Sequence, residues 1–240
     1  MSIPKIIHYC WFGGKALPED LEKYIESWKR YLPDYQIIEW NESNFNIQES
    51  EFVRQAYEAK KYAFVSDYAR LAALYRFGGI YLDVDIQVLK PLEESMLENE
   101  GIFCFESDEK IMTAFMAVEK EHKIIREFLD TYSNKNFDIE SMVPNTEILT
   151  ELLEKHGLQI NGKRQQMGNI QVFSNEYFNA FDLKNSVYCI TKKTYMIHHF
   201  YGSWCSPKEK FVFEFQKKIR TVLGQKNFDR LKWIKKKIIG

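Results

Sequence analysis

Two carboxylates stand in an otherwise apolar stretch of the sequence, FGGIYLDVDIQVL, which covers residues 77–89. Because side chains alternate between the two faces of a β-strand, we expect Asp83 and Asp85 to share one face. Neighbouring carboxylates repel each other unless a cation lies between them. Carboxylate oxygens bind Mg²⁺ or Mn²⁺, and such an ion can in turn hold a diphosphate. The alternative is a half-exposed strand whose solvent face carries both charges.

Two other classes of phosphate-processing enzyme use a similar Asp-x-Asp pattern, and both fit poorly. Phosphatases of the haloacid-dehalogenase type have Thr or Val at the fifth position, early in the chain, whereas Gln87 stands there in this sequence. Nucleotidyltransferases of the polymerase-β type have a Gly-Gly or Gly-Ser pair at a helix start, well before the acidic pair. Here Gly78 and Gly79 lie close to Asp83 and follow a helical pattern.

In residues 54–77, which precede the acidic pair, apolar residues recur every three or four positions. This spacing predicts a helix, and Gly78 and Gly79 predict its end. Asp67 and Arg70 are three residues apart in this helix, so they lie on one face. Such a pair is commonly only a surface salt bridge. Because the helix leads directly into the Asp-x-Asp stretch, we expect the pair to meet the two carboxylates at one pocket.

The remaining pattern predicts an α/β protein. Short apolar runs predict strands over residues 4–12, 35–40, 101–106 and 190–200, and amphipathic periods predict helices over residues 18–31, 123–132 and 146–157. Alternating strands and helices favour a sheet with helices on its faces. The sequence shows no internal repeat and no low-complexity linker. We therefore predict one domain over residues 1–207, followed by a basic amphipathic helical segment over residues 208–240.

The composition excludes several classes of protein. With 240 residues, 45% of them hydrophobic and 15% aromatic, the chain can bury a large core, which argues against a disordered or fibrous protein. No apolar run approaches the ~20 residues of a spanning helix, and the N-terminus lacks a signal-peptide pattern, so we expect a cytoplasmic protein. The four cysteines are scattered and form no CxxC pair, which indicates neither a disulfide framework nor a zinc site.

Charge is distributed unevenly along the chain. From residue 208 to residue 240, eleven Lys and Arg stand against three acidic residues, or +8, which leaves −9 for residues 1–207 within a total of −1. Basic residues interleaved with Trp and Ile suit an anionic membrane surface, such as the inner face of the cell membrane. The alternative is a solvated helix that packs one face on the domain. Nucleic acid is disfavoured as a partner because the rest of the chain is acidic.

Three separated stretches resemble one family. The segment AFVSDYARLAALYRFGGIYLDVDIQVLKPL is similar to the signature of glycosyltransferases with a DXD-containing sugar-binding region, also called glycosyltransferase family 32. That family includes yeast Och1-like mannosyltransferases and bacterial capsular polysaccharide glycosyltransferases, and it is distantly related to the clostridial glucosylating toxins. IPKIIHYCWFGG resembles the opening strand of the family, and HHFYGSW resembles its C-terminal motif. The resemblance implies a GT-A fold, a Rossmann-like α/β nucleotide-sugar-binding fold.

The resemblance also implies roles for individual residues. In such enzymes the opening strand receives the nucleotide, here through His8, Trp11 and Phe12. The positions of Asp67 and Arg70 contact the donor hexose and its phosphate. Ser203 and Trp204 of the C-terminal motif would lie near the diphosphate.

A divalent ion, Mn²⁺ or Mg²⁺, is the implied cofactor. Asp85 would be its ligand, Asp83 would face the ribose and sugar and share the metal site, and a histidine of HHFYGSW would complete the set. The pattern alone does not separate His198 from His199, and alternation together with the family motif favours His199. The chain departs from the usual family pattern at Thr113 and at residues 145–147, which puts the substrate in doubt but not the reaction class.

The implied activity is the metal-dependent transfer of a hexose from a nucleotide sugar, with retention of anomeric configuration. We expect UDP-galactose or UDP-glucose as the donor rather than GDP-mannose. The expected acceptor is a glycan, and specifically a lipid-linked oligosaccharide of capsular or exopolysaccharide synthesis. No general base is assigned, because the leaving phosphate can itself take the proton of the acceptor. Two alternatives stay open: a toxin-like enzyme that modifies host proteins, and an inactive member that only binds sugar nucleotides.

Overall fold

A seven-stranded mixed sheet forms the centre of the protein, in the order β2-β1-β3-β6-β5-β8-β7. The computed structural model describes residues 2–133, 135–182 and 187–202. The strands of this sheet are β1 (Ile6–Cys10), β2 (Gln36–Trp40), β3 (Gly79–Leu82), β5 (Gly101–Cys104), β6 (Phe115–Val118), β7 (Gln165–Met167) and β8 (Ile170–Phe173). β1 runs parallel to both of its neighbours, β2 and β3, as the β-α-β pattern at the start of the chain predicts. The strands predicted at residues 4–12, 35–40 and 101–106 are thus confirmed as β1, β2 and β5.

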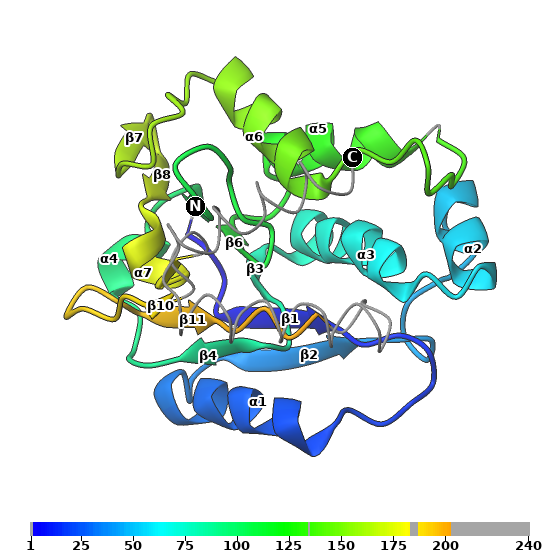
Figure 1. Ribbon diagram of the computed structural model, residues 1–240, viewed down its shortest axis with the longest axis horizontal. Coiled ribbons are helices and arrows are strands. Elements are labelled where there is room, and N and C mark those ends of the chain that lie inside the picture. The colour runs from blue at the N-terminus through cyan, green and yellow to red at the C-terminus, as the bar shows by residue number, and fades with distance from the viewer. Residues whose placement is uncertain (1, 134, 183–186, 203–240) are drawn as a thin grey trace, which may run out of the picture.

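Helices cover both faces of the sheet (Figure 1). One layer contains α2 (Glu51–Glu58), α3 (Tyr62–Phe77), α5 (Lys123–Ser133) and α6 (Asn145–Lys155), and the other contains α1 (Glu19–Tyr31), α4 (Glu94–Leu97) and α7 (Asn175–Phe178). Each layer has its own apolar core, around Leu71 and Phe128 on the first face and around Trp28 and Phe115 on the second. This three-layer arrangement confirms the α/β prediction. Within the described residues, no helix combines the length and the apolar character that crossing a bilayer requires.

Two short ribbons lie outside the central sheet. β4 (Ile86–Val88) pairs antiparallel with β11 (Met196–His198), and β9 (Phe181–Asp182) pairs with β10 (Val187–Tyr188). The β4–β11 ribbon packs on α1, where the Trp28 indole donates a hydrogen bond to the Ile86 carbonyl at 2.6 Å. This ribbon brings the C-terminal end of the described chain back to the Asp-x-Asp stretch.

The prediction of one continuous strand through both carboxylates is wrong. The chain leaves β3 at Leu82 and turns, with the Ile86 amide donating to the Asp83 carbonyl at 2.9 Å, before it forms β4. Apolar side chains on both sides of the turn are buried: Ile80, Leu82, Val84, Ile86 and Val88. The alternating pattern therefore continues through the turn, which is why periodicity alone did not reveal it.

The helix predicted over residues 54–77 is two helices. α2 begins earlier than predicted, where the Ser50 hydroxyl accepts a hydrogen bond from the Val53 amide at 3.2 Å, as N-cap residues do. The chain then breaks at Lys60, whose φ of 57° is left-handed, and α3 follows. The break separates the amphipathic α2 from α3, the helix that carries Asp67 and Arg70.

Two glycines join α3 directly to β3, as the sequence predicts. Gly78 ends the helix with a φ of 65°, and Gly79 starts the strand with a φ of 104°. A Cβ on Gly79 would lie 2.5 Å from the Ile6 carbonyl oxygen, so no larger residue fits without displacing β1. This tight connection sets the distance between the helix face that carries Arg70 and the end of β3, where Asp83 begins.

Candidate active site

Asp83 and Asp85 occupy the turn between β3 and β4. The Asp83 amide donates to the Ala114 carbonyl at 2.9 Å, which holds the start of the turn against the loop before β6. The side chain of Asp83 is 29% exposed and that of Asp85 is 10% exposed. The turn therefore presents one carboxylate toward solvent and keeps the other largely buried.

The buried carboxylate, Asp85, is held by the chain that follows β11. Its Oδ1 lies 3.3 Å from His198 Nε2, and its Oδ2 accepts a hydrogen bond from the Tyr201 amide at 2.7 Å. Burial alone raises the pKa of Asp85, but the positive charge of His198 and the hydrogen bonds outweigh it, so the pKa is lowered. Burial lowers the pKa of His198, but the charge and hydrogen bond of Asp85, together with the charges of Asp83 and Glu106, outweigh it, so the pKa is raised. Asp85 is thus an ionised ligand candidate at neutral pH.

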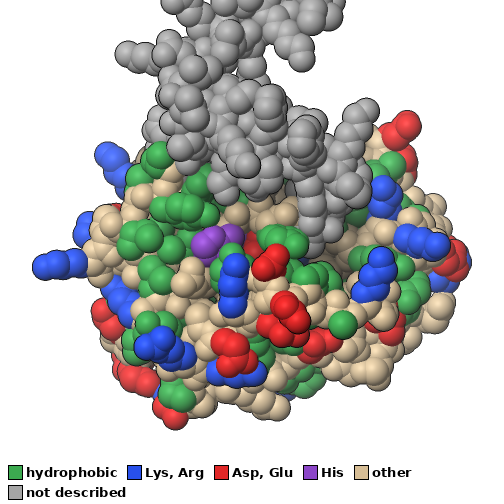
Figure 2. All heavy atoms as spheres, turned by 60° about the horizontal axis from the view of Figure 1, so that its bottom comes forward, with side chains coloured by type: hydrophobic (Ala, Val, Ile, Leu, Met, Phe, Trp, Pro, Cys, Tyr) green, Lys and Arg blue, Asp and Glu red, His purple; other side chains and the backbone are tan. Residues whose placement is uncertain are grey.

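Three side chains converge in a way that suits a divalent cation. One oxygen of Asp83, one oxygen of Asp85 and one nitrogen of His198 all lie within 4.8 Å of one another. Two carboxylates and an imidazole form a donor set that Mn²⁺ accepts readily and Mg²⁺ accepts through its oxygen ligands. Figure 2 shows histidine and acidic side chains reaching the same part of the described surface. The residues present therefore fit the predicted metal.

Arg70 lies beside Asp83 and connects it to α3. Its Nη2 is 3.0 Å from Asp67 Oδ1 and 3.5 Å from Asp83 Oδ1, and its Nη1 donates to the Thr113 carbonyl at 3.0 Å. Arg70 is only 6% exposed, so most of its guanidinium faces protein groups. The prediction that Asp67, Arg70 and Asp83 meet at one place is confirmed. In this conformation, however, Arg70 binds the carboxylates and offers little surface to a donor phosphate.

Asp67 belongs to the same network. Its Oδ1 accepts a hydrogen bond from the Asn145 side-chain amide at 2.6 Å in addition to the contact with Arg70. Burial raises the pKa of Asp67 to about 6, although the charge of Arg70 opposes the change. Asp67 therefore gains and loses its proton nearer to neutral pH than an exposed aspartate does.

Tyr81 is a site residue to which the sequence argument assigned no role. Its hydroxyl donates to Asp83 Oδ1 at 2.8 Å, and the Arg70 guanidinium lies 4.6 Å from the centre of its ring. The alternation of β3 places Tyr81 on the face of Asp83, which was the available signal. Thr113 and Asn145 were noted only as departures from a family pattern, and the structure shows their contacts with Arg70 and Asp67.

The histidine nearest to the carboxylates is His198, contrary to the preference for His199. His198 is the last residue of β11, and its ring points to Asp85. His199 lies with its ring stacked on Tyr24, at a centroid distance of 4.5 Å, and with Nε2 3.0 Å from Gln87 Oε1. Alternation does not apply to this pair, because β11 ends at His198 and His199 lies outside the strand. The orientation of each ring is therefore determined by its own neighbours.

The opening strand does not present its aromatic residues as expected. His8 is fully buried, with Nε2 2.8 Å from the Gly78 carbonyl and Nδ1 accepting from Trp40 at 3.1 Å, so this conformation leaves it no contact with a nucleotide. Phe12 is also buried and packs edge-on against Phe45. Trp11 is half-buried, and its indole donates to the Lys15 carbonyl. Of the three predicted nucleotide contacts, Trp11 is the one that retains accessible surface.

Some predicted residues lie outside the described part of the chain. Ser203, Trp204 and the basic segment 208–240 belong to this group, so their predicted roles stay predictions. Near the end of the described part, the Tyr201 amide contacts Asp85, and Gly202 is the last residue described.

Comparisons with known proteins place a sequence match over the stretch that carries these residues. Residues 18–102, which include Asp67, Arg70, Asp83 and Asp85, match the model of the family described as glycosyltransferase sugar-binding region containing DXD motif. An uncharacterized glycosyltransferase of Acanthamoeba polyphaga mimivirus is 26% identical over 217 residues, or 84% of each chain. Inositol phosphoceramide mannosyltransferase 1 of Schizosaccharomyces pombe is 27% identical over 148 residues, which are 56% of this chain and 44% of the yeast protein.

A solved structure supports the fold. The PaToxG glycosyltransferase superposes with a TM-score of 0.53 over 64% of this chain and 70% of its own, at 21% sequence identity. The order of elements, the mixed sheet and the turn that holds the acidic pair thus form a GT-A fold, as the sequence predicts.

Proposed function

We propose a metal, a donor and an acceptor for this chain, whose residues 18–102 match the glycosyltransferase sugar-binding region containing a DXD motif. It transfers a hexose from a nucleotide sugar, UDP-galactose or UDP-glucose, to a glycan carried on a lipid, in capsular or exopolysaccharide synthesis. The anomeric configuration is retained. The observation that carries the proposal is the convergence of Asp83, Asp85 and His198 within 4.8 Å beside the network of Arg70.

Asp83, Asp85 and His198 would hold Mn²⁺ or Mg²⁺. When bound, the ion supplies positive charge that stabilises the leaving nucleoside diphosphate. Asp83 is the most exposed of the three side chains, so it is also the carboxylate that can accept a hydrogen bond from a hydroxyl of the donor. The proposed third metal ligand is therefore His198 and not His199, which the sequence pattern favoured.

Arg70 acts in this proposal by positioning carboxylates. Its contacts with Asp67 and Asp83 keep two oxygen acceptors at one side of the pocket, and the Tyr81 hydroxyl fixes the same Asp83 oxygen. Rigid acceptors lower the entropy cost of orienting a sugar. The acceptor hydroxyl passes its proton to the leaving phosphate, so retention needs no protein base.

A lipid-borne acceptor has two supports. The name of the yeast relative specifies inositol phosphoceramide, a lipid, as the molecule that is mannosylated. The sequence of residues 208–240 carries a charge of +8, which would attract anionic lipid headgroups. We expect the full chain to sediment with vesicles that contain anionic lipid, and truncation after residue 207 to abolish that sedimentation. A truncated protein that still sediments would contradict the membrane part of the proposal.

The donor is identified by thermal unfolding with UDP-galactose, UDP-glucose and GDP-mannose, each with and without Mn²⁺. A ligand at one hundred times its Kd adds about 2.7 kcal/mol to the free energy of unfolding. We expect a UDP-hexose to stabilise the protein in the presence of Mn²⁺ and much less in EDTA. Stabilisation that is independent of the metal, or is caused by GDP-mannose alone, would contradict the proposed metal or donor.

The metal site and the stereochemistry are tested separately. In the Asp85→Asn variant we expect Mn²⁺ binding and turnover to fall together, while the surface variant Asp34→Asn retains both. The configuration of the new linkage is measured by NMR of the anomeric proton in the product. An inverted product would overturn the retaining mechanism without affecting the metal assignment.

A further inference from the structure

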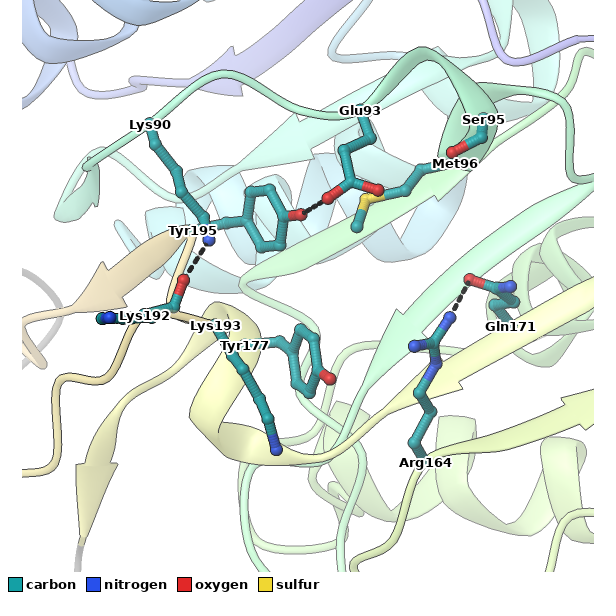
Figure 3. A pocket seen from close by; sticks show the side chains of 10 residues that line it. All are labelled: Lys90, Glu93, Ser95, Met96, Arg164, Gln171, Tyr177, Lys192, Lys193 and Tyr195. Atoms are coloured by element: carbon teal, nitrogen blue, oxygen red, sulfur yellow. Dashed lines mark hydrogen bonds between the residues drawn. The ribbon is translucent and has the colours of Figure 1, made fainter.

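A second pocket lies at the other end of the β4–β11 ribbon. Its volume is about 350 Å³, within the range of small-molecule sites. Its wall comes from separate parts of the fold: Lys90 after β4, Arg164 before β7, Tyr177 in α7, and Lys192 and Tyr195 before β11. Figure 3 shows Glu93, Arg164, Tyr177 and Tyr195 around a common space, whereas the Lys192 side chain extends away from them.

The pocket carries excess positive charge. Lys90, Arg164, Lys192 and Lys193 line it, together with the single carboxylate Glu93. Lys193 is paired with Glu176 at 3.1 Å. Within the described part of the chain, the other three cations form no ion pair: the Lys90 ammonium donates to the Lys192 carbonyl at 2.5 Å, and Arg164 contacts the neutral Gln171 amide. A cleft lined by cations of this kind attracts anions.

The remaining wall is aromatic and polar. Tyr195 is buried, with the Lys90 ammonium 3.9 Å from its ring centre, so it forms a floor that keeps the cation in place. The half-buried Tyr177 lies nearly parallel to Tyr195 and offers a ring face. Glu93 accepts a hydrogen bond from the Tyr195 hydroxyl, and a carboxylate has further acceptor positions for hydroxyl groups.

This pocket is separate from the candidate active site. It shares no residue with Asp83, Asp85 or His198. Asp85 and Lys90 lie beyond opposite ends of β4, so the two sites are at opposite ends of this strand. A ligand as small as the pocket therefore occupies one site or the other.

We propose that this pocket binds a phosphorylated saccharide. Lys90 and Arg164 supply charge-assisted hydrogen bonds to the phosphate. Tyr177 packs against the C–H face of the sugar ring, and Glu93 accepts hydroxyl hydrogen bonds. Glu93 favours a saccharide phosphate over inorganic phosphate, since its carboxylate repels either phosphate but can accept hydrogen bonds from sugar hydroxyls only in the first case. The inference does not depend on the proposed hexosyl transfer.

Calorimetric titration of the full chain in EDTA provides the test, with glucose 6-phosphate, glucose and inorganic phosphate as probes. We expect glucose 6-phosphate to bind at least about tenfold more tightly than either of the other two. The Asp85→Asn variant should bind it as the wild type does, because the pocket is separate. Equal affinity for inorganic phosphate and glucose 6-phosphate would overturn the proposal, since the site would then recognise only charge.

Variants locate the binding. Arg164→Gln and Lys90→Gln should each weaken binding of glucose 6-phosphate by about tenfold, the effect of one charged hydrogen bond. Lys123→Gln, a matched change at an exposed side chain of α5, should leave it unchanged. Unchanged thermal midpoints establish that the variants fold. Binding that survives both pocket variants but is lost in Asp85→Asn would place the ligand at the active site and overturn the proposal, without bearing on hexosyl transfer.

Discussion

The guanidinium of Arg70 lies 3.5 Å from Asp83 Oδ1, although Arg70 belongs to α3 and Asp83 to the turn after β3. The same nitrogen is 3.0 Å from Asp67, so one buried cation holds two carboxylates on different elements. Unpaired buried charges are costly, and each of these groups compensates another. The site is therefore also a structural joint between the helix layer and the sheet.

Replacement of this cation tests the joint. Arg70→Lys keeps the charge but cannot reach Thr113, Asp67 and Asp83 with one planar group, so we expect the free energy of unfolding to fall by about 3 kcal/mol. Arg54→Lys is the matched control, because Arg54 pairs with Glu51 and Glu58 on the surface, where solvent screens the charges, so this variant should lose much less stability than Arg70→Lys. Urea unfolding measures both. An equal loss of unfolding free energy in both variants would show that the ion pairs of Arg70 contribute no more to stability than those on the surface.

The two adjacent histidines should behave differently toward the metal. His198→Gln removes a candidate ligand 3.3 Å from Asp85, so we expect the Kd for Mn²⁺ to rise by at least about tenfold. His199→Gln keeps a side chain that can still hydrogen-bond Gln87, and Mn²⁺ affinity should change little. Electron paramagnetic resonance titration of free Mn²⁺ measures each Kd directly. A larger loss in His199→Gln would restore the original preference.

The junction between α3 and β3 should tolerate no side chain. At Gly79 an added Cβ meets the Ile6 carbonyl oxygen at 2.5 Å on a backbone with a φ of 104°. Gly79→Ala should therefore cost about 3 kcal/mol through crowding and backbone strain together. Gly14→Ala is the control, since its φ of 65° is also left-handed but an added Cβ finds open space, and about 1 kcal/mol is expected. Denaturant midpoints that shift equally would exclude crowding as the cause.

His122 should make the fold sensitive to acid. Burial lowers the pKa of His122 to about 4, from an unfolded value of 6.5, with Glu100 opposing the change. The unfolded chain then binds more protons than the folded one between these values, so stability rises with pH across that window. Between pH 7 and pH 5 this group alone should remove about 2 kcal/mol from the free energy of unfolding.

The variant His122→Leu isolates this contribution. When the pH is lowered from 7 to 5, the free energy of unfolding of the variant should rise relative to that of the wild type by the same amount, about 2 kcal/mol. A difference that is the same at both pH values would mean that His122 is protonated equally in the folded and unfolded states.

Several features of the site followed from local sequence patterns. The spacing of Asp67 and Arg70 placed them on one helix face, and the two glycines marked the helix end, because both depend on the geometry of a single turn. The α/β class followed from the alternation of short apolar runs, typical of strands, with segments of helical hydrophobic period. The strands β6, β7 and β8 were not predicted, since β6 is a short, fully buried run and β7 and β8 lack a clear alternation.

Other features needed contacts between distant segments. The family resemblance implied nucleotide contacts for His8 and Phe12, whereas packing against Trp40 and Phe45 buries both side chains. Likewise, the turn at residues 83–85 could not be recognised from the sequence. Buried apolar residues alternate with other residues both before and after it, so the hydrophobic period is the same as that of one continuous strand.

The sequence by itself determined which groups could do the chemistry: two carboxylates at fixed spacing, an Asp–Arg pair one helical turn apart, and a glycine joint between them. Only the tertiary structure decided that the chain turns between β3 and β4, that His198 rather than His199 faces Asp85, and that Arg70 is buried behind its carboxylates. The physical reason is that helix and strand periods are local. Pairing of β4 with β11 and burial against distant side chains are set by the whole fold.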